Sequence, residues 1–273
     1  MSGKLYVVGT PIGNLQDFSP RAVQVLSSVD FIAAEDTRVT VKLLNHFNIH
    51  KPMVAYFEHN KKDRGKTVIE RMLAGESCAI VTDAGMPAIS DPGEDLVREA
   101  RDKGIEVESV PGPVAFATAL AVSGMSSGRF CFEGFLSVNR PARMKHLDEV
   151  KRERRTMIFY EAPHKLLKTL TDMREAFGER NISVVRELTK IHESVMRTNF
   201  AEAIEYFTQN QPRGEFVLII EGAPETVVAY TLEDAVQLAK NLVKDGNSAS
   251  AAAKEAAGIT GIKKSEIYKQ MLV

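Results

Sequence analysis

The sequence has 273 residues, of which 44% are hydrophobic and 26% charged, the composition of a globular protein with room for two domains. The formal net charge of −1 excludes nucleic-acid binding through an overall positive charge, so any such contact needs a local basic cluster. The sequence has only two cysteines, no Cys/His cluster with zinc spacing and no apolar run near the ~18 residues of a membrane helix, which predicts a cytoplasmic protein without disulfides, metal or membrane span.

Short apolar runs alternate with amphipathic segments along the first half of the chain, which is typical of a parallel α/β sheet. A serine or an aspartate before a proline is typical of a helix start, so helices are predicted to begin at Pro20, capped by Ser19, and at Pro92, capped by Asp91. The predicted strands are 5–8, 31–34, 53–57, 79–82 and 107–110, and the later predicted helices are 36–47, 63–73 and 92–103.

The stretch AIVTDAGMPAISDPG, residues 79–93, joins a buried type of strand to a loop of small and polar residues. Ligands of open α/β sheets bind at such loops beyond the carboxyl ends of strands, although an ordinary strand-to-helix connection is the alternative. Comparable loops follow two other predicted strands, at 9–14 and 111–113. The glycine spacing of 9–14 is not that of a dinucleotide fingerprint, and Pro11 lacks a backbone donor, so a ligand without phosphate is favoured.

The segment 114–122, VAFATALAV, predicts a helix that is apolar on nearly every side. Such a helix is expected to be buried, and the N–H groups at its start are available to a ligand. The Ser- and Gly-rich stretch that follows, residues 123–128, interrupts the pattern and predicts a domain boundary.

Three charged residues, Glu35, Asp36 and Arg38, follow the predicted strand 31–34 and precede a helix. They have three interpretations: caps of the helix, a substrate-facing acid and base set, or the acidic residue that binds a ribose in nucleotide folds. The charged loop 58–64 is either solvated surface or part of the same rim.

The second half of the chain predicts another α/β domain, with a mixed sheet, followed by a helical tail. Residues 139–155 carry eight basic side chains, which form either a solvated helix face or a contact for RNA phosphates. The tail has the outline of a helix-turn-helix, although a plain bundle is equally compatible. The predicted domains are residues 1–123, 124–227 and 231–273. The predicted strands are 132–136, 157–160, 182–185 and 216–220, and the predicted helices include 200–207, 232–244, 249–257 and 263–272.

The loops carry, in order, the motifs GTPIGNL, AAEDTR, VTDAGMPAISDPG, VPGP, FEGFL, FYEAPH, RELTK-HE and RGEF-L-IEG. In this order they resemble the bacterial small-subunit (16S) ribosomal RNA cytidine 2′-O-methyltransferases, a family of the tetrapyrrole methylase superfamily. The resemblance spans nearly the whole chain. Two positions depart from the usual pattern: Ser137 stands where proline usually follows FEGFL, and Gly9 stands where some members have another residue.

The resemblance implies two α/β domains of the tetrapyrrole methylase type with the cofactor cleft between them, plus a small C-terminal helical module. It implies S-adenosyl-L-methionine as cofactor, a homodimer, and 16S rRNA or the assembled small ribosomal subunit as substrate. It weakens the ribose interpretation of Glu35 and Asp36, which would face the RNA instead. The cofactor contacts are predicted at Pro11, Asp83, Gly85, Met86, Ile89, Val114, Ala115, Tyr160 and Glu215.

The implied reaction needs a group that removes the proton of a ribose 2′-hydroxyl, and it needs no metal. Carboxylates and His59 on the predicted rim are candidates for the base, and basic residues would hold phosphates or favour ionisation of the hydroxyl. The catalytic candidates are Glu35, Asp36, Arg38, Glu161, Arg186, Glu187 and Lys190.

Two other classes of function stay open from the residues alone. A small-molecule methylase of the tetrapyrrole type would share the cofactor cleft but would not need the basic segment 139–155 or the helical tail. A DNA-binding regulator that senses a nucleotide would need a basic recognition helix, and the last predicted helix offers only Lys263, Lys264 and Lys269.

Overall fold

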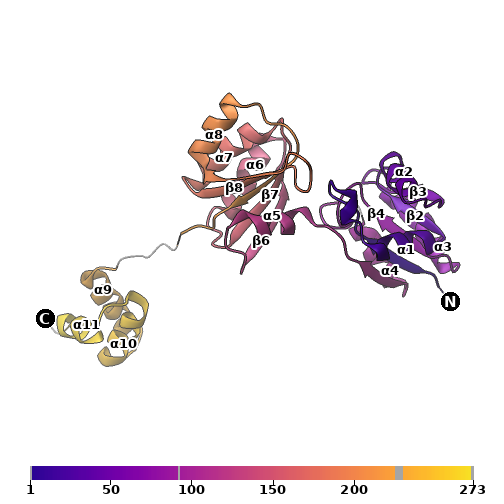
Figure 1. Ribbon diagram of the computed structural model, residues 1–273. Coiled ribbons are helices and arrows are strands. Elements are labelled where there is room, and N and C mark those ends of the chain that lie inside the picture. The colour runs from indigo at the N-terminus through magenta and orange to yellow at the C-terminus, as the bar shows by residue number, and fades with distance from the viewer. Residues whose placement is uncertain (1, 92, 225–229, 272–273) are drawn as a thin grey trace. The chain divides into compact units, whose positions relative to one another are not determined.

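The computed structural model describes residues 2–91, 93–224 and 230–271, shown in Figure 1. The chain divides into two compact units, Met1–Ala223 and Pro224–Val273, and each is described by itself. Within the described residues, the structure contains no helix that is both long and apolar enough to cross a membrane.

The first sheet of the larger unit is entirely parallel, with strand order β3-β2-β4-β1-β5. Helices α1 and α2 pack on one face through Ala22, Leu26 and Leu44, and helices α3 and α4 pack on the other through residues such as Met72 and Leu96. Because β2 and β4 are buried on both faces, they consist of small and apolar residues throughout. The elements are β1 (Lys4–Val8), α1 (Pro20–Ser28), β2 (Phe31–Ala34), α2 (Thr37–His46), β3 (Met53–Ala55), α3 (Lys61–Leu73), β4 (Cys78–Val81), α4 (Glu94–Asp102) and β5 (Glu106–Val110).

The second sheet is mixed, as predicted, with strand order β6-β7-β10-β8-β9. Strands β6 and β7 run parallel, whereas the pairs that follow are antiparallel. One face is covered by α6, α7 and α8, and α5 covers the other (Figure 1). The elements are α5 (Ala115–Ser123), β6 (Phe130–Phe135), α6 (Arg140–Val150), β7 (Thr156–Glu161), α7 (Leu166–Phe177), β8 (Asn181–Arg186), β9 (Ser194–Asn199), α8 (Phe200–Gln209) and β10 (Phe216–Ile220).

Helix α5 differs from its prediction in two respects. Its buried residues Ala119 and Leu120 pack on Ile158 and Val217 of the second sheet, although the predicted boundary at residue 123 grouped this helix with the first. The expected burial on all sides is wrong, because only one face of α5 meets a sheet and the side chain of Val122 is 46% exposed.

The start of α4 also corrects a prediction. Asp91 is not the N-cap: the helix begins at Glu94, and its N-cap is Gly93, whose φ of +139° a side chain would not tolerate. Pro92, predicted as the first helical residue, lies outside the described residues. Ser19 and Pro20 do cap and begin α1 as expected, since the Ser19 hydroxyl accepts from the Ala22 N–H at 3.1 Å.

The described residues of the smaller unit form three helices, α9 (Leu232–Lys244), α10 (Ala249–Thr260) and α11 (Lys264–Met271). Thr231 forms a capping box with Asp234 at the start of α9, and Ser248 caps α10. Alanines of α9 and α10 form a small core with Ile267 of α11. Helix α10 continues beyond its predicted end at residue 257 and is capped by Gly261 in the left-handed conformation.

The loops that follow β1 and β5 meet backbone to backbone, which generates a prediction for Gly112. A Cβ atom at Gly112 would lie 2.8 Å from the Cα of Gly9, and neither backbone can move aside. We expect Gly112→Ala to lower the free energy of unfolding by about 1–3 kcal/mol, as other overpacked sites do. Urea unfolding measures this loss. The matched control is Gly128→Ala, whose Cβ would meet nothing within 4 Å, and equal stability of the two variants would contradict the prediction.

Candidate functional site

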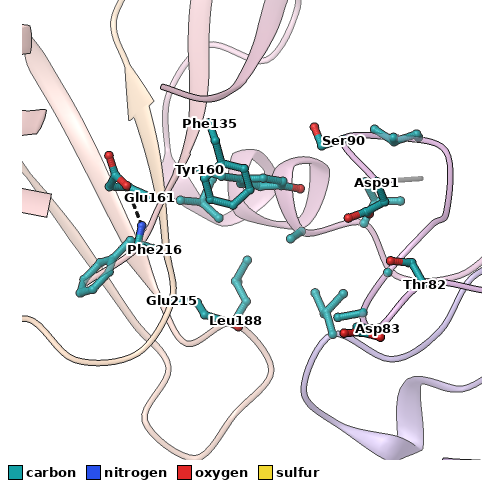
Figure 2. A pocket seen from close by; sticks show the side chains of 18 of the residues that line it. Thr82, Asp83, Ser90, Asp91, Phe135, Tyr160, Glu161, Leu188, Glu215 and Phe216 are labelled. Carbon is teal, nitrogen blue, oxygen red and sulfur yellow. Dashed lines mark hydrogen bonds between the residues drawn. The ribbon is translucent and has the colours of Figure 1, made fainter. Parts of the chain in front are cut away.

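A cavity of about 600 Å³ lies within the larger unit, and Figure 2 shows it. We call it the cofactor cavity, because most of the cofactor contacts predicted from the sequence line it. One side carries Thr82, Asp83 and Asp91 from the connection after β4, and the other carries Phe135 and Tyr160 from β6 and β7. Of its described lining residues, six carry a carboxyl group and none is lysine or arginine. The carboxyl-bearing residues are Glu35, Asp83, Asp91, Glu161, Glu187 and Glu215.

Backbone pairing fixes the loop that follows β4. Thr10 and Gly85 form an isolated antiparallel bridge, in which the Thr10 N–H donates to Gly85 O at 2.9 Å and the Gly85 N–H donates to Thr10 O at 3.2 Å. The Thr10 hydroxyl also donates to Thr82 O at 3.2 Å. Because the Gly85 N–H is already used, Gly85 contributes a φ of +90° and open space rather than a free donor.

The same loop contains two non-glycine residues in the left-handed region, Ala88 with φ of +66° and Ser90 with φ of +64°. Each such conformation costs on the order of 1–3 kcal/mol and persists only where the surroundings impose it. Between them, Ile89 has a 41% exposed side chain that lines the cofactor cavity. The strained backbone therefore presents an apolar side chain to the cavity.

Three carboxyl groups lie close together at the ends of β2 and β4. The carboxylate of Glu35 accepts a hydrogen bond from the Thr82 hydroxyl, and the carboxylate of Asp83 accepts from the Asp36 N–H at 3.1 Å. Burial and the negative charges of Glu35 and Asp83 raise the pKa of Asp91 to about 7. Burial and the charge of Glu35 also raise the pKa of Asp83. Asp91 is therefore half protonated near neutral pH.

Aromatic side chains form the opposite wall. The Tyr160 hydroxyl accepts a hydrogen bond from the Phe116 N–H at 3.0 Å, which connects β7 to the first turn of α5. The ring centroids of Tyr160 and Phe135 are 5.3 Å apart. Burial raises the pKa of Tyr160 to about 12, so its hydroxyl keeps its proton. One of the N–H groups of α5 that we expected to be free for a ligand is thus already satisfied.

An ion-pair network closes the rim of the second sheet. Lys190 Nζ lies 2.9 Å from carboxylate oxygens of both Glu187 and Glu215. The Glu215 N–H donates to the Glu187 carboxylate at 2.9 Å. Burial lowers the pKa of Lys190, but its hydrogen bonds to the two glutamates outweigh burial and the net shift is upward. Lys190 therefore stays charged and partly neutralises this side.

Of the residues predicted to contact the cofactor, all but Pro11 line the cavity, and the neighbour of Pro11, Ile12, lines it instead. Of the predicted catalytic residues, Glu35, Glu161 and Glu187 line the cavity.

The other four predicted catalytic residues, among them Lys190 of the ion-pair network, are absent from the described lining. Asp36 caps α2 and pairs with Arg38 at 2.6 Å, as the capping interpretation expected. Arg186 donates to Arg213 O at 2.7 Å.

Glu161 has the contacts of a structural residue. Its side chain is buried, and its carboxylate accepts from the Thr169 hydroxyl and the Ala162 N–H. Lys165 Nζ lies 3.2 Å from the same carboxylate. Figure 2 shows this carboxylate directed away from Tyr160 and Asp91. These contacts join the end of β7 to α7.

The predicted basic segment is largely paired with acidic residues. Arg143 lies 2.6 Å from Asp172 with both side chains buried, and Arg140 pairs with Asp172 and Glu175. His146 contacts Glu133 at 2.9 Å. Arg140 and Arg143 therefore anchor helix α6 to α7 rather than standing free for phosphates.

The sequence prediction missed Asp91 as a site residue, because aspartate before proline is a typical helix cap. It also missed Phe135 and Leu188, which line the cavity as apolar residues within recognised motifs. The sequence did contain an indication for Asp91, because Asp83 stands eight residues before it, at the end of a predicted strand.

The raised pKa of Asp91 predicts how stability depends on pH. The folded protein keeps this proton up to a pKa of about 7, whereas the ordinary aspartate value is 3.8, so the contribution of Asp91 to stability decreases as pH rises through this interval. We expect Asp91→Asn to be more stable than the wild type above about pH 7 and equal to it near pH 4. Urea unfolding across this range measures the difference.

The control is Asp102→Asn, which changes an exposed residue at the end of α4. Its stability relative to the wild type should not vary across the same pH range. A constant difference between Asp91→Asn and the wild type would contradict the expected pH dependence.

Comparison with known proteins places these features in a family. The family model of the tetrapyrrole (corrin/porphyrin) methylases matches residues 4–204. A relative from Synechocystis, named ribosomal RNA small subunit methyltransferase I, is 46% identical over 272 residues, covering 99% of this chain and 98% of the relative. Relatives of the same name include one from Pseudomonas aeruginosa, 45% identical over 99% of this chain and 97% of its own length. Another, from Thermotoga maritima, is 46% identical over 81% of this chain and 99% of its own length.

Solved structures share the fold at low sequence identity. Diphthine synthase superposes with a TM-score of 0.61 at 12% identity, covering 81% of this chain and 90% of its own. A Thermus thermophilus uroporphyrin-III C-methyltransferase complexed with S-adenyl homocysteine has a TM-score of 0.57 at 16% identity, covering 80% of this chain and 97% of its own. The expected fold of two α/β sheets is thus confirmed. The chain belongs to the tetrapyrrole methylases and, within them, to the family of ribosomal RNA small subunit methyltransferase I proteins.

Proposed function

We propose that the chain is an S-adenosyl-L-methionine-dependent enzyme that methylates the ribose 2′-hydroxyl of a cytidine in 16S ribosomal RNA. The names of relatives that are 41–47% identical over most of the chain support ribosomal RNA as the substrate. The methyltransferase solved with S-adenyl homocysteine supports the cofactor class. The cytidine and the 2′-oxygen are what the family resemblance of the sequence motifs implies.

The charge of the cofactor cavity carries the cofactor assignment. Three of its carboxyl groups, those of Glu35, Asp83 and Asp91, lie together without a lysine or arginine among the described lining residues, so this side of the cavity repels a pyrophosphate and attracts a cation. S-adenosyl-L-methionine carries a positive sulfur and an ammonium group and has no phosphate. Met86, Ile89 and Leu188 add apolar surface that suits its uncharged parts.

The residues of the cavity then have separate roles. Bound S-adenosyl-L-methionine supplies a methyl group on a good leaving group, so the protein has to position the ribose hydroxyl and remove its proton. Asp91 is the proposed base, because a carboxylate with a pKa of about 7 accepts a proton at neutral pH more readily than an ordinary one. Glu35 supports it, since its charge is one cause of the raised pKa of Asp91.

We further propose a cytoplasmic homodimer that acts on 16S rRNA or the assembled small subunit. Val122 of α5 and Phe130 of β6 expose apolar surface of the kind that a second copy would cover, with exposed fractions of 46% and 39%. Strand β6 is also an edge of its sheet. A small-molecule methylase of the same fold is the alternative, and the substrate test below separates the two.

Binding and product mapping test the activity. Calorimetry should show binding of S-adenosyl-L-methionine and S-adenosylhomocysteine, and no comparable binding of NAD or ATP. Transfer of a tritiated methyl group to 16S rRNA or small subunits should produce a 2′-O-methylcytidine, which is absent from the rRNA of cells that lack this chain. Binding of NAD or ATP alone would contradict the cofactor assignment. Transfer to a tetrapyrrole but not to rRNA would favour the alternative.

The role of Asp91 predicts a change in both rate and pH profile. Asp91→Asn should lower kcat by about 100-fold, a typical contribution of a general base, and leave cofactor binding nearly unchanged. Glu35→Gln removes a charge that raises the pKa of Asp91, so the acidic limb of kcat/KM should move to lower pH. Asp102→Asn is the control for both. An unaltered kcat in Asp91→Asn would refute the proposed base.

A further inference from the structure

A second cavity, of about 530 Å³, adjoins the cofactor cavity. We call it the Phe57 cavity. The two cavities share three lining residues, Glu35, Ser90 and Asp91. A group bound in the Phe57 cavity is therefore separated only by these side chains from whatever occupies the cofactor cavity. The remaining residues of its lining are Phe57, Glu58, His59, Ala88 and Glu94.

An exposed aromatic ring forms part of its wall. Tyr56 is buried, but the next residue, Phe57, is 39% exposed. A short turn fixes the backbone here: the Phe57 N–H donates to the Asn60 side chain at 2.8 Å, and Asn60 Nδ2 donates to Ala55 O at 3.0 Å. Because the turn is fixed from both sides, the ring of Phe57 is held at the cavity and offers a surface on which a planar group can stack.

Most polar groups of the Phe57 cavity are carboxyl groups, which accept hydrogen bonds, and the others are Ser90 and His59. Its described lining includes several carboxyl groups and no lysine or arginine, so a phosphate would be repelled. Glu58, whose side chain is 65% exposed, pairs with Lys61 at 2.7 Å, and Lys61 also pairs with Asp95 at 2.8 Å. A carboxylate has further acceptor sites free after one ion pair. A planar, neutral ligand that carries N–H donors can stack on the Phe57 ring and donate hydrogen bonds to the carboxyl groups.

We propose that the Phe57 cavity binds the unpaired base of the nucleotide whose ribose is methylated, and that the base carries an exocyclic amine. Phe57 stacks on the base, and Glu58 accepts a hydrogen bond from the amine. The sugar of that nucleotide then lies at the shared wall, beside Glu35 and Asp91. This inference rests on the proposed function, since it concerns the substrate of the same site.

Variants of Phe57 test the stacking contact. With unmethylated small subunits as substrate, Phe57→Ala should lower kcat/KM for RNA about tenfold, in the range of a lost base–aromatic stack, and Phe57→Tyr should restore it. The dissociation constant of S-adenosyl-L-methionine should stay the same in both. Tyr206→Ala is the control, because Tyr206 of α8 is also an exposed aromatic residue, at 48%, and is not among the residues that line either cavity. Thermal unfolding midpoints identify any variant that fails to fold.

A change in the substrate tests the amine contact independently. 16S rRNA that carries pyrimidin-2-one ribonucleoside at the methylated position lacks only the amine of cytosine. With the wild type, this change should lower kcat/KM about tenfold, and with Glu58→Gln it should lower it much less, because the acceptor is already weakened.

The outcomes separate a failure of the base-binding cavity from a failure of the proposed function on which it rests. If the wild type methylates the rRNA but Phe57→Ala and Tyr206→Ala have equal kcat/KM, the base-binding cavity would be overturned and the proposed function left intact. The same holds if the missing amine causes the same loss in the wild type and in Glu58→Gln. If the wild type places no 2′-O-methyl group on rRNA that carries cytidine at this position, both the base-binding cavity and the proposed function would be overturned.

Discussion

The backbone contacts between the loops after β1, β4 and β5 are the constraint on which the site depends. Thr10 pairs with Gly85, and Gly9 meets Gly112 at distances that only glycines permit. The carboxyl ends of neighbouring parallel strands lie at one edge of a sheet, so these three loops come together there by topology. Their mutual contacts then use backbone groups that would otherwise be free for a phosphate. A ligand is therefore contacted mostly by side chains and by the contour of the cavity, not by backbone N–H groups.

This constraint explains the unusual charge of the cavity. A site that binds phosphates exploits free backbone N–H groups at a helix start, but here Gly85 and Phe116 already donate within the protein. Carboxylates at the strand ends add negative charge instead, and their mutual repulsion together with burial keeps a proton on Asp91 near neutral pH. An acidic cavity favours the proposed cationic donor and raises the pKa of Asp91, the proposed base. The same charge repels RNA phosphates, so in the proposed function the RNA backbone passes outside the two cavities while a sugar and its base enter.

The sequence predicted the architecture better than the site. The all-parallel first sheet, the mixed second sheet and the caps at Ser19 and Ser248 follow from local patterns, because burial on both faces and capping chemistry leave clear signals. Strand β9 was missed, since it is a partly exposed edge strand of mixed polarity.

For the site, the motifs placed most of the lining but not the direction of each side chain. Glu161 is buried against Thr169, and Asp91 faces the cavity rather than capping a helix. No local pattern encodes such directions, which follow from tertiary packing and from strained residues such as Ser90.

The helical tail is separable from this chemistry. The cofactor cavity and the Phe57 cavity are both lined by residues between Ile12 and Val217, all within the larger unit. The relative from Thermotoga maritima is matched over 99% of its length by only 81% of this chain, and the family model ends at residue 204, before the smaller unit begins. The smaller unit has its own core and its own capped helices. The described lining of both cavities therefore owes nothing to the helical tail, and the chemistry of the site is contained in the larger unit.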